Sequence, residues 1–271
     1  MTESIIWTTL IALTAVLVSF FLGIRATLNT FSRMEREKLN NVIRALRDEE
    51  DDAEDFVYAR AEDLVDQILV NTEATEYRLF LTGKDNFRYT IYPEYKAHRP
   101  KEKPFWLEKC RQYLIATFNA EVVSGQEADD AMGIAQTEDT VICSIDKDLL
   151  MIPGRHYNFV KDEYMEVSPE KAMRHFYTQC LTGDRSDNIK GIEKIGPKKA
   201  EKLLANCVTE KEMFDVVREA YSNDEEFIMN ARVLWIRRKE NEDWKDRFNA
   251  LVQEQVGGTS LDNTEEGISV S

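Results

Sequence analysis

The chain has 271 residues, of which 43% are hydrophobic and 31% charged, a composition typical of a folded protein rather than a disordered one. Its formal net charge of −15 argues against a protein that coats nucleic acid non-specifically. A nucleic-acid enzyme is not excluded, because carboxylates that bind metal ions count fully as negative in this sum. Four cysteines without a C-x-x-C spacing argue against a zinc site and are typical of a reducing compartment.

The N-terminal segment contains an uncharged, mostly apolar run at residues 5–24, which is long enough to cross a bilayer as a helix. Basic residues follow this run from Arg25 onward, so the positive-inside rule places the remainder of the chain on the cytoplasmic side. The alternative is a buried strand and the start of a helix within a soluble fold. We favour a membrane segment at residues 1–27, followed by an amphipathic and acidic linker at 28–54.

From residue 55 to 167 the apolar pattern alternates between strands and helices. Strands are expected at 77–82, 121–124 and 140–145, and helices at 56–70, 104–118 and 127–135. This alternation predicts a mostly parallel α/β sheet flanked by helices, with its site beyond the carboxyl ends of the strands. From 168 to 256 the signals are helical, and the polar stretch 257–271 is expected to be a disordered tail.

Three acidic clusters lie beside apolar segments, each at an expected strand end or helix start. Residues two apart at a strand end, or three apart at a helix start, project to the same side. Two divalent ions about 4 Å apart can cleave a phosphodiester, and Mg²⁺ prefers carboxylate oxygens as ligands. Any one cluster could arise by chance among 50 acidic residues, so the prediction depends on their shared position. We predict one Mg²⁺ site formed by seven carboxylates: Glu127, Asp129, Asp130, Asp146, Asp148, Asp184 and Asp187.

Two further segments have features of nucleic-acid binding. Residues 87–99 (FRYTIYPEYKAHR) mix aromatic and cationic side chains, a combination that holds single-stranded nucleic acid, although an ordinary surface loop has the same composition. In residues 191–199 (GIEKIGPKK), two glycines let the backbone approach a phosphate, and the helix that follows favours an anion at its N-terminus. A glycine turn between two core helices fits equally well, and both interpretations can hold together.

These segments together resemble the 5′-nuclease (flap endonuclease) family, in its bacteriophage and polymerase-associated 5′–3′ exonuclease branch. GQEADDAMG, SIDKDLLMIPG and LTGDRSDNIKGIEKIGPKKAEKLL match three hallmark segments of that family in order and spacing. Residues 92–100 (YPEYKAHRP) resemble the segment that opens its helical gateway. The resemblance covers about residues 55–204. It implies a PIN-like nuclease core followed by a helix-three-turn-helix element that binds DNA.

The resemblance also implies roles for individual residues. Two Mg²⁺ ions, or Mn²⁺ in their place, are expected: the tighter one at the first two acidic clusters and the second at Asp184 and Asp187. Lys96 and Arg99 match the basic pair that contacts the scissile phosphate and the 5′ strand. The turn from Gly191 to Gly196 matches one whose backbone binds duplex DNA, commonly through K⁺. The predicted contacts with DNA are Arg88, Tyr95, Gly191, Ile192, Ile195, Gly196, Lys198 and Lys199.

Two positions depart from the family pattern. The family opens with a strand that ends in Asp-Gly, and this aspartate is a central metal ligand, but no such pair precedes Phe56. The nearest candidate strand, LVSFFLGI, places Ser19 where the aspartate belongs. Leu81 and Thr82 stand where many members carry an acidic residue after the second strand. Because loss of the central carboxylate commonly impairs cleavage, the residues support the fold more strongly than the activity.

Two functions are therefore predicted. The first is a monomeric, metal-dependent 5′–3′ exonuclease or flap endonuclease that acts on 5′ ends during replication, in the cytoplasm or in the host cytoplasm if the protein is viral. Its substrate is DNA or an RNA primer paired with DNA, and water attacks the phosphodiester while Lys96 and Arg99 stabilise the leaving side. The alternative is a catalytically impaired, membrane-tethered module that keeps the nuclease fold and binds DNA.

Overall fold

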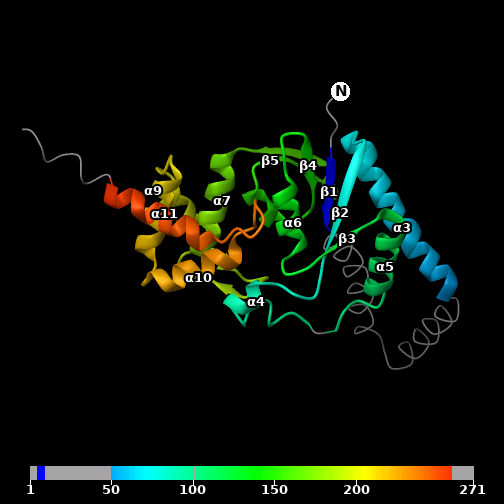
Figure 1. Cartoon of the computed structure of the whole chain (residues 1–271), viewed down its shortest axis with the longest axis horizontal. Coiled ribbons are helices and arrows are strands. Elements are labelled where there is room, and N and C mark those ends of the chain that lie inside the picture. Colours follow the sequence, from blue (N-terminus) through cyan, green and yellow to red (C-terminus); the bar gives the residue numbers. More distant parts are fainter. Residues whose placement is uncertain (1–4, 10–49, 101, 258–271) are drawn as a thin grey trace, which may run out of the picture. The chain divides into compact units, whose positions relative to one another are not determined.

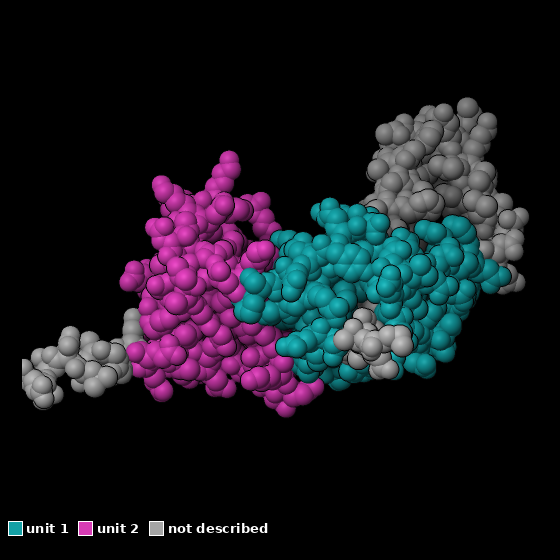
Figure 2. Space-filling model, turned by 90° about the horizontal axis from the view of Figure 1, so that it is seen from above, with its two compact units in different colours: residues 1–87, 99–169 teal, residues 88–98, 170–271 magenta. Residues whose placement is uncertain are grey.

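The computed structural model describes residues 5–9, 50–100 and 102–257 (Figure 1). The chain divides into two compact units, coloured separately in Figure 2. Unit 1 comprises residues 1–87 and 99–169, and unit 2 comprises residues 88–98 and 170–271. The short segment 88–98 therefore belongs with the C-terminal unit, although both of its flanking segments belong to unit 1.

Unit 1 is built on a six-stranded sheet with the order β3-β2-β1-β4-β5-β6. Neighbouring strands are parallel except β5 and β6, which form an antiparallel hairpin. The chain runs from β1 outward to β2 and β3, and then returns to place β4 on the other side of β1. In such sheets the crevice at the carboxyl ends of the two strands where the order reverses is the usual binding site. The strands are β1 (Ile5–Thr9), β2 (Glu76–Thr82), β3 (Glu121–Val123), β4 (Thr140–Cys143), β5 (Gly154–Asn158) and β6 (Glu163–Val167).

Helices pack against this sheet through apolar side chains. The long helix α3 (Glu50–Thr72) buries Ala61 and Val65 against Leu79 and Leu81 of β2, together with Leu114 of α5 (Leu107–Phe118). Farther along the same helix, Ile68 packs with residues of β4 and β5. The short helix α6 (Ala128–Ala135) lies against β1, β2 and β3, and a 3₁₀ helix, η1 (Lys147–Met151), follows β4. The predicted parallel sheet flanked by helices is confirmed.

The N-terminal apolar run is a strand where the structure describes it. Residues 5–9 form β1 in the middle of the sheet, hydrogen-bonded to β2 and β4, so the predicted membrane helix beginning at residue 5 is wrong. None of the helices in the described part of the chain is long and apolar enough to cross a membrane. The sequence IIWTT has the β-branched and aromatic residues that strands favour, and hydropathy alone does not separate a buried strand from a membrane segment.

Other N-terminal predictions fall largely outside the described residues. Residues 10–49 lie there, including most of the linker and Ser19, the position at which we expected the first strand to end. The described part of the first strand is Ile5–Thr9, which pairs with β2 and β4, and the expected position of Ser19 at a strand end stays a prediction. The last residues of the expected linker, from Glu50, are the beginning of α3. The predicted tail at 258–271 likewise lies outside the described residues.

Unit 2 consists mainly of helices around an aromatic core. Phe176 of α7 contacts Trp235 edge to face, with ring centroids 4.9 Å apart, and Phe227 of α10 contacts Trp244 of α11 at 5.1 Å. A two-stranded hairpin follows α7, and segment 88–98 contributes the short helix α4. The elements are α4 (Arg88–Ile91), α7 (Pro169–Thr182), β7 (Gly183–Asp184), β8 (Ile189–Lys190), α8 (Pro197–Leu204), α9 (Glu210–Ala220), α10 (Asp224–Leu234) and α11 (Trp244–Gly257).

Candidate functional site

The first acidic cluster lies at the N-terminus of α6, just beyond β3. Glu127 is the N-cap residue, and its backbone N–H donates a hydrogen bond to Asp130 Oδ2 at 2.9 Å. Asp130 is fully buried, while Glu127 and Asp129 are each 8% exposed. Asp130 thus caps a helix, a role that accounts for it without any ligand. Burial of three neighbouring carboxylates is costly, so a bound cation would stabilise this helix start.

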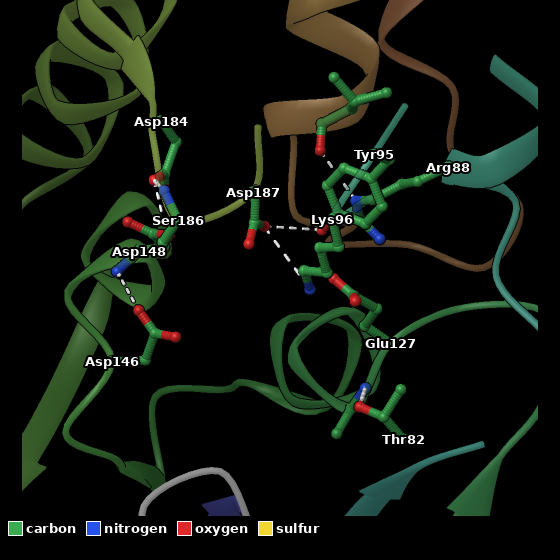
Figure 3. Close-up of polar contacts among 12 residues, drawn as sticks. Thr82, Arg88, Tyr95, Lys96, Glu127, Asp146, Asp148, Asp184, Ser186 and Asp187 are labelled. Atoms are coloured by element: carbon green, nitrogen blue, oxygen red, sulfur yellow. Dashed lines mark hydrogen bonds and ion pairs between the residues drawn. The ribbon is translucent and has the colours of Figure 1, made fainter. Parts of the chain in front are cut away.

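Thr82 connects this helix start to the sheet. Its hydroxyl oxygen accepts a hydrogen bond from the backbone N–H of Ala128 at 3.0 Å (Figure 3). Its carbonyl oxygen accepts a second bond, at 2.9 Å, from the guanidinium of Arg111 on α5. From the resemblance to the 5′-nuclease family, an acidic residue is expected at the position of Thr82. Here Thr82 instead holds the N-terminus of α6 at the carboxyl end of β2, a role the sequence did not suggest.

The second cluster follows β4 directly. Asp146 is the N-cap of η1, and its Oδ1 accepts a hydrogen bond from the backbone N–H of Asp148 at 2.9 Å (Figure 3). The backbone N–H of Asp146 donates in turn to Ser144 Oγ at 3.0 Å. Both aspartates are partly exposed, and the exposed Lys147 ammonium lies 3.9 Å from Asp148. The first two clusters therefore both follow carboxyl ends of parallel strands in unit 1.

The third cluster is the turn of the β7–β8 hairpin in unit 2. Asp184 is buried, and its Oδ1 accepts hydrogen bonds from both the backbone N–H and the hydroxyl of Ser186, each at 2.7 Å. Asp187 Oδ2 accepts a bond from the Tyr95 hydroxyl at 2.8 Å and lies 3.5 Å from the Lys96 ammonium. Figure 3 shows Asp187 facing both of these side chains. The acidic turn is thus joined to segment 88–98.

The two predicted catalytic cations have different surroundings. Lys96 lies within unit 2, with a left-handed backbone (φ 56°), and its N–H donates to the carbonyl of Asp187 at 2.9 Å. Its ammonium also lies 4.7 Å from the centre of the Tyr95 ring, a cation–π distance. Arg99 is exposed and belongs to unit 1.

Two of the predicted DNA contacts are buried instead. Arg88 is 2% exposed, and its guanidinium donates hydrogen bonds at 2.8 Å to the backbone carbonyls of Val233 and Trp235. Tyr95 is also 2% exposed, with its hydroxyl bonded to Asp187. The prediction that these side chains contact DNA does not agree with the structure, because both are buried and are hydrogen-bonded to other residues of unit 2.

The glycine-rich turn shows the structural role that its sequence allowed, while its role in binding phosphate stays a prediction. A Cβ on Gly191 would lie 2.1 Å from the carbonyl carbon of Thr182, so no side chain fits and this glycine is required by the fold. Gly196 is exposed, and a Cβ there would meet nothing within 4 Å, so its backbone is open to a ligand. Gly196 is also the N-cap of α8, and the first turn of that helix carries the exposed Lys198 and Lys199. Ile192 and Ile195, between the glycines, are half-buried.

The carboxylates suit a hard divalent cation by chemistry, since all seven supply oxygen ligands. Among the residues that the structure describes, however, no three or more Asp, Glu, His or Cys side chains form a group that could hold a metal ion. The convergence of seven carboxylates into one site is therefore not observed and stays a prediction. Capping, in the case of Asp130, and hydrogen bonds to Ser186, in the case of Asp184, are the roles that the structure gives directly.

Comparison with curated proteins finds similar chains among bacterial 5′–3′ exonucleases. The chain is 30% identical over 148 residues to a 5′-3′ exonuclease of Mycoplasmopsis pulmonis, an alignment that covers 48% of this chain and 50% of that protein. It is 30% identical over 166 residues to a 5′-3′ exonuclease of Buchnera aphidicola, covering 53% and 57% respectively. A DNA polymerase I of Rhizobium leguminosarum is 36% identical over 151 residues, which are 46% of this chain and 14% of the polymerase. The chain thus spans about half the length of the two exonucleases. No family model matches it.

Solved structures with a similar fold come from bacteriophage T5. The D15 flap endonuclease, in a complex with DNA and metal ions, superposes with a TM-score of 0.54 at 14% identity, over 94% of this chain and 95% of that protein. The T5 5′-exonuclease with bound zinc gives 0.54 at 16% identity, over 86% and 89%. At these identities the likeness establishes the fold. The chain is therefore similar in sequence to 5′–3′ exonucleases and in fold to a phage flap endonuclease, as its acidic and glycine-rich segments predicted.

Proposed function

We propose that the chain is a divalent-metal-dependent 5′–3′ exonuclease or flap endonuclease that hydrolyses phosphodiester bonds of DNA at 5′ ends or flaps during replication. The observation that carries this proposal is the buried acidic start of α6, where Glu127, Asp129 and Asp130 lie beyond the carboxyl end of a parallel strand. Buried carboxylates at such a place are typical of a cation site in an α/β fold. The sequence similarity to 5′–3′ exonucleases supports the same reaction.

The residues divide into two functional groups. The carboxylates of the three clusters would hold two Mg²⁺ or Mn²⁺ ions, which supply an activated water and stabilise the leaving oxygen when bound. Lys96 would contact the scissile phosphate, with Arg99 on the 5′ strand. The open backbone at Gly196, with Lys198 and Lys199, would bind the phosphates of duplex DNA, with K⁺ as a bridging ion. RNA primers paired with DNA present similar phosphates. We expect a monomer that acts in the cytoplasm.

A second candidate is a DNA-binding protein of the same fold that has lost the reaction. One observation favours it: β1, in the centre of the sheet, has the sequence IIWTT and contains no carboxylate, whereas the family's first strand ends in a metal-binding aspartate. Fewer carboxylates hold a divalent ion less tightly. Such a protein would bind flap DNA through the turn between Gly191 and Gly196 without cutting it.

Cleavage of a 5′-labelled flap duplex by the full chain, with Mg²⁺ or with EDTA, tests the proposal. We expect cutting in Mg²⁺ that EDTA abolishes and that falls about 100-fold or more in Asp146→Asn and Asp148→Asn, because each change removes a ligand charge. Asp139→Asn is the matched control, since Asp139 is exposed and lies outside the three clusters. Binding of the duplex without cutting would favour the second candidate. Unchanged rates in both cluster variants would refute the assignment of the site.

A further inference from the structure

Asn188, in the turn of the β7–β8 hairpin, is bonded to the segment that carries Lys96. Its side-chain amide donates a hydrogen bond to the backbone carbonyl of Glu94 at 2.8 Å. Its own carbonyl accepts a bond at 3.2 Å from the hydroxyl of Tyr92. The same hydroxyl also donates to the carboxylate of Glu94 at 3.2 Å, so its single proton is shared between the two acceptors. Asn188 therefore holds the turn formed by residues 92–96, here called the lysine turn, at two points.

The backbone conformation at this position restricts which residue can make these contacts. Asn188 has φ 61°, in the left-handed region, which asparagine adopts more readily than most residues other than glycine. The hydrogen bond to Glu94 in addition needs a side-chain N–H donor at this place. Glycine adopts the left-handed backbone but has no side-chain donor, and an ionised aspartate cannot donate. Asparagine combines the left-handed backbone with a side-chain N–H donor.

The lysine turn ends at Lys96, whose direction depends on the same contacts. Lys96 also has a left-handed backbone (φ 56°), and its N–H donates to the carbonyl of Asp187, the neighbour of Asn188. The side chains of Lys96 and Asp187 are 12% and 15% exposed, with 3.5 Å between ammonium and carboxylate. The backbone of the lysine turn sets the direction of the Lys96 side chain. Removal of the contacts that support this turn would therefore displace the Lys96 ammonium.

We propose that Asn188 is a positioning residue, which fixes the lysine turn against the β7–β8 hairpin so that the Lys96 ammonium is held in place for its phosphate contact. The structural part of this proposal stands on the contacts of unit 2 alone. The part that concerns the phosphate depends on the function proposed above. The role of Asn188 could not be recognised from local sequence patterns, because its partners lie 94 and 96 residues earlier in the chain.

The test uses Asn188→Gly, which keeps the left-handed backbone without strain and removes only the side-chain donor. Asn241→Gly is the matched control, because Asn241 is also a left-handed asparagine of unit 2 (φ 56°) and its side chain is exposed. The first measurement is the rate at which an N-hydroxysuccinimide ester acylates the Lys96 amine in the folded protein. Mass spectrometry of the peptide that contains Lys96 follows this rate. We expect a several-fold faster reaction in Asn188→Gly and no change in Asn241→Gly. An unchanged rate in Asn188→Gly would overturn the proposal.

The second measurement is single-turnover cleavage of the flap duplex in the same variants. Misplacement of a group that contacts the reacting phosphate commonly lowers the rate by about ten- to a hundredfold. We therefore expect a loss of about tenfold in Asn188→Gly, and no further loss when the same change is added to Lys96→Ala. Independent, additive losses would overturn the proposal, because Asn188 would then act without Lys96. If the unaltered chain does not cut, the function fails while the acylation rates still decide the positioning role.

Discussion

Replacement of Arg88 by methionine distinguishes the structural role seen here from the contact with DNA that the sequence suggested. The guanidinium of Arg88 donates 2.8 Å hydrogen bonds to the carbonyls of Val233 and Trp235, and the side chain is 2% exposed. Methionine keeps much of the volume but leaves both buried carbonyls without these donors. Hydrogen bonds from a charged group contribute about 1.5–3 kcal/mol each, so the loss of two in Arg88→Met should lower the free energy of unfolding by about 3–6 kcal/mol.

Urea denaturation and thermal unfolding, followed by circular dichroism, measure this loss. A change of that size lowers the melting temperature by an amount on the order of 10 °C in a chain of this length. Lys198→Met is the control, since Lys198 is exposed: it should leave stability within about 0.5 kcal/mol and weaken binding of duplex DNA. Weaker DNA binding by Arg88→Met, with unchanged stability, would refute the structural role and restore the contact with DNA.

Two further predictions concern the helix start at α6 and the pH dependence of unit 2. Thr82→Val removes the hydroxyl that accepts the N–H of Ala128, so unfolding in urea should show a loss of about 1–2 kcal/mol that Thr82→Ser does not share; equal losses in both variants would contradict this role. The hydrogen bond from Arg218 lowers the pKa of Asp224. The pair therefore stabilises the fold above the unfolded value of about 3.9, and the contribution is lost as the pH falls through the lower folded value. Asp224→Asn should show a smaller fall in melting temperature between about pH 5 and pH 2; identical profiles would contradict the assignment.

Local sequence signals were sufficient for much of the fold. The apolar runs at β2 and β4 and the acidic residues that follow β3 and β4 lie where alternating strand and helix patterns placed them. Such patterns work because the period of apolar residues reports which face of an element is buried. They failed at β1 (Ile5–Thr9), because an apolar strand in the centre of a sheet has the same hydropathy as part of a membrane segment.

The candidate site was less predictable, since side-chain roles there depend on partners that are distant in the sequence. Arg88 has the charge of a phosphate ligand, but the carbonyls that it contacts lie 145 and 147 residues later. In the sequence, Thr82 is a position at which the family's carboxylate is missing. In the structure, its hydroxyl accepts a hydrogen bond from the N–H of Ala128. A buried hydrogen bond can satisfy a polar side chain as fully as a ligand can, and composition does not distinguish the two.

The central strand gives the sharpest physical contrast between the two candidate functions. β1 pairs in parallel with β4, with Thr8 opposite Cys143, so its carboxyl end is level with the strand end that leads to Asp146. The sequence beyond Thr9 reaches its first acidic residue only at Glu35. The described strand β1 thus offers no carboxylate to a metal ion, and an ion at this edge of the sheet would depend on the acidic residues that follow β3 and β4. The charge of the ligands sets the affinity for a divalent ion. A nuclease without the first-strand aspartate is therefore expected to need a higher Mg²⁺ concentration for half-maximal cutting than one that has it. A protein that only binds DNA would need no Mg²⁺ for binding.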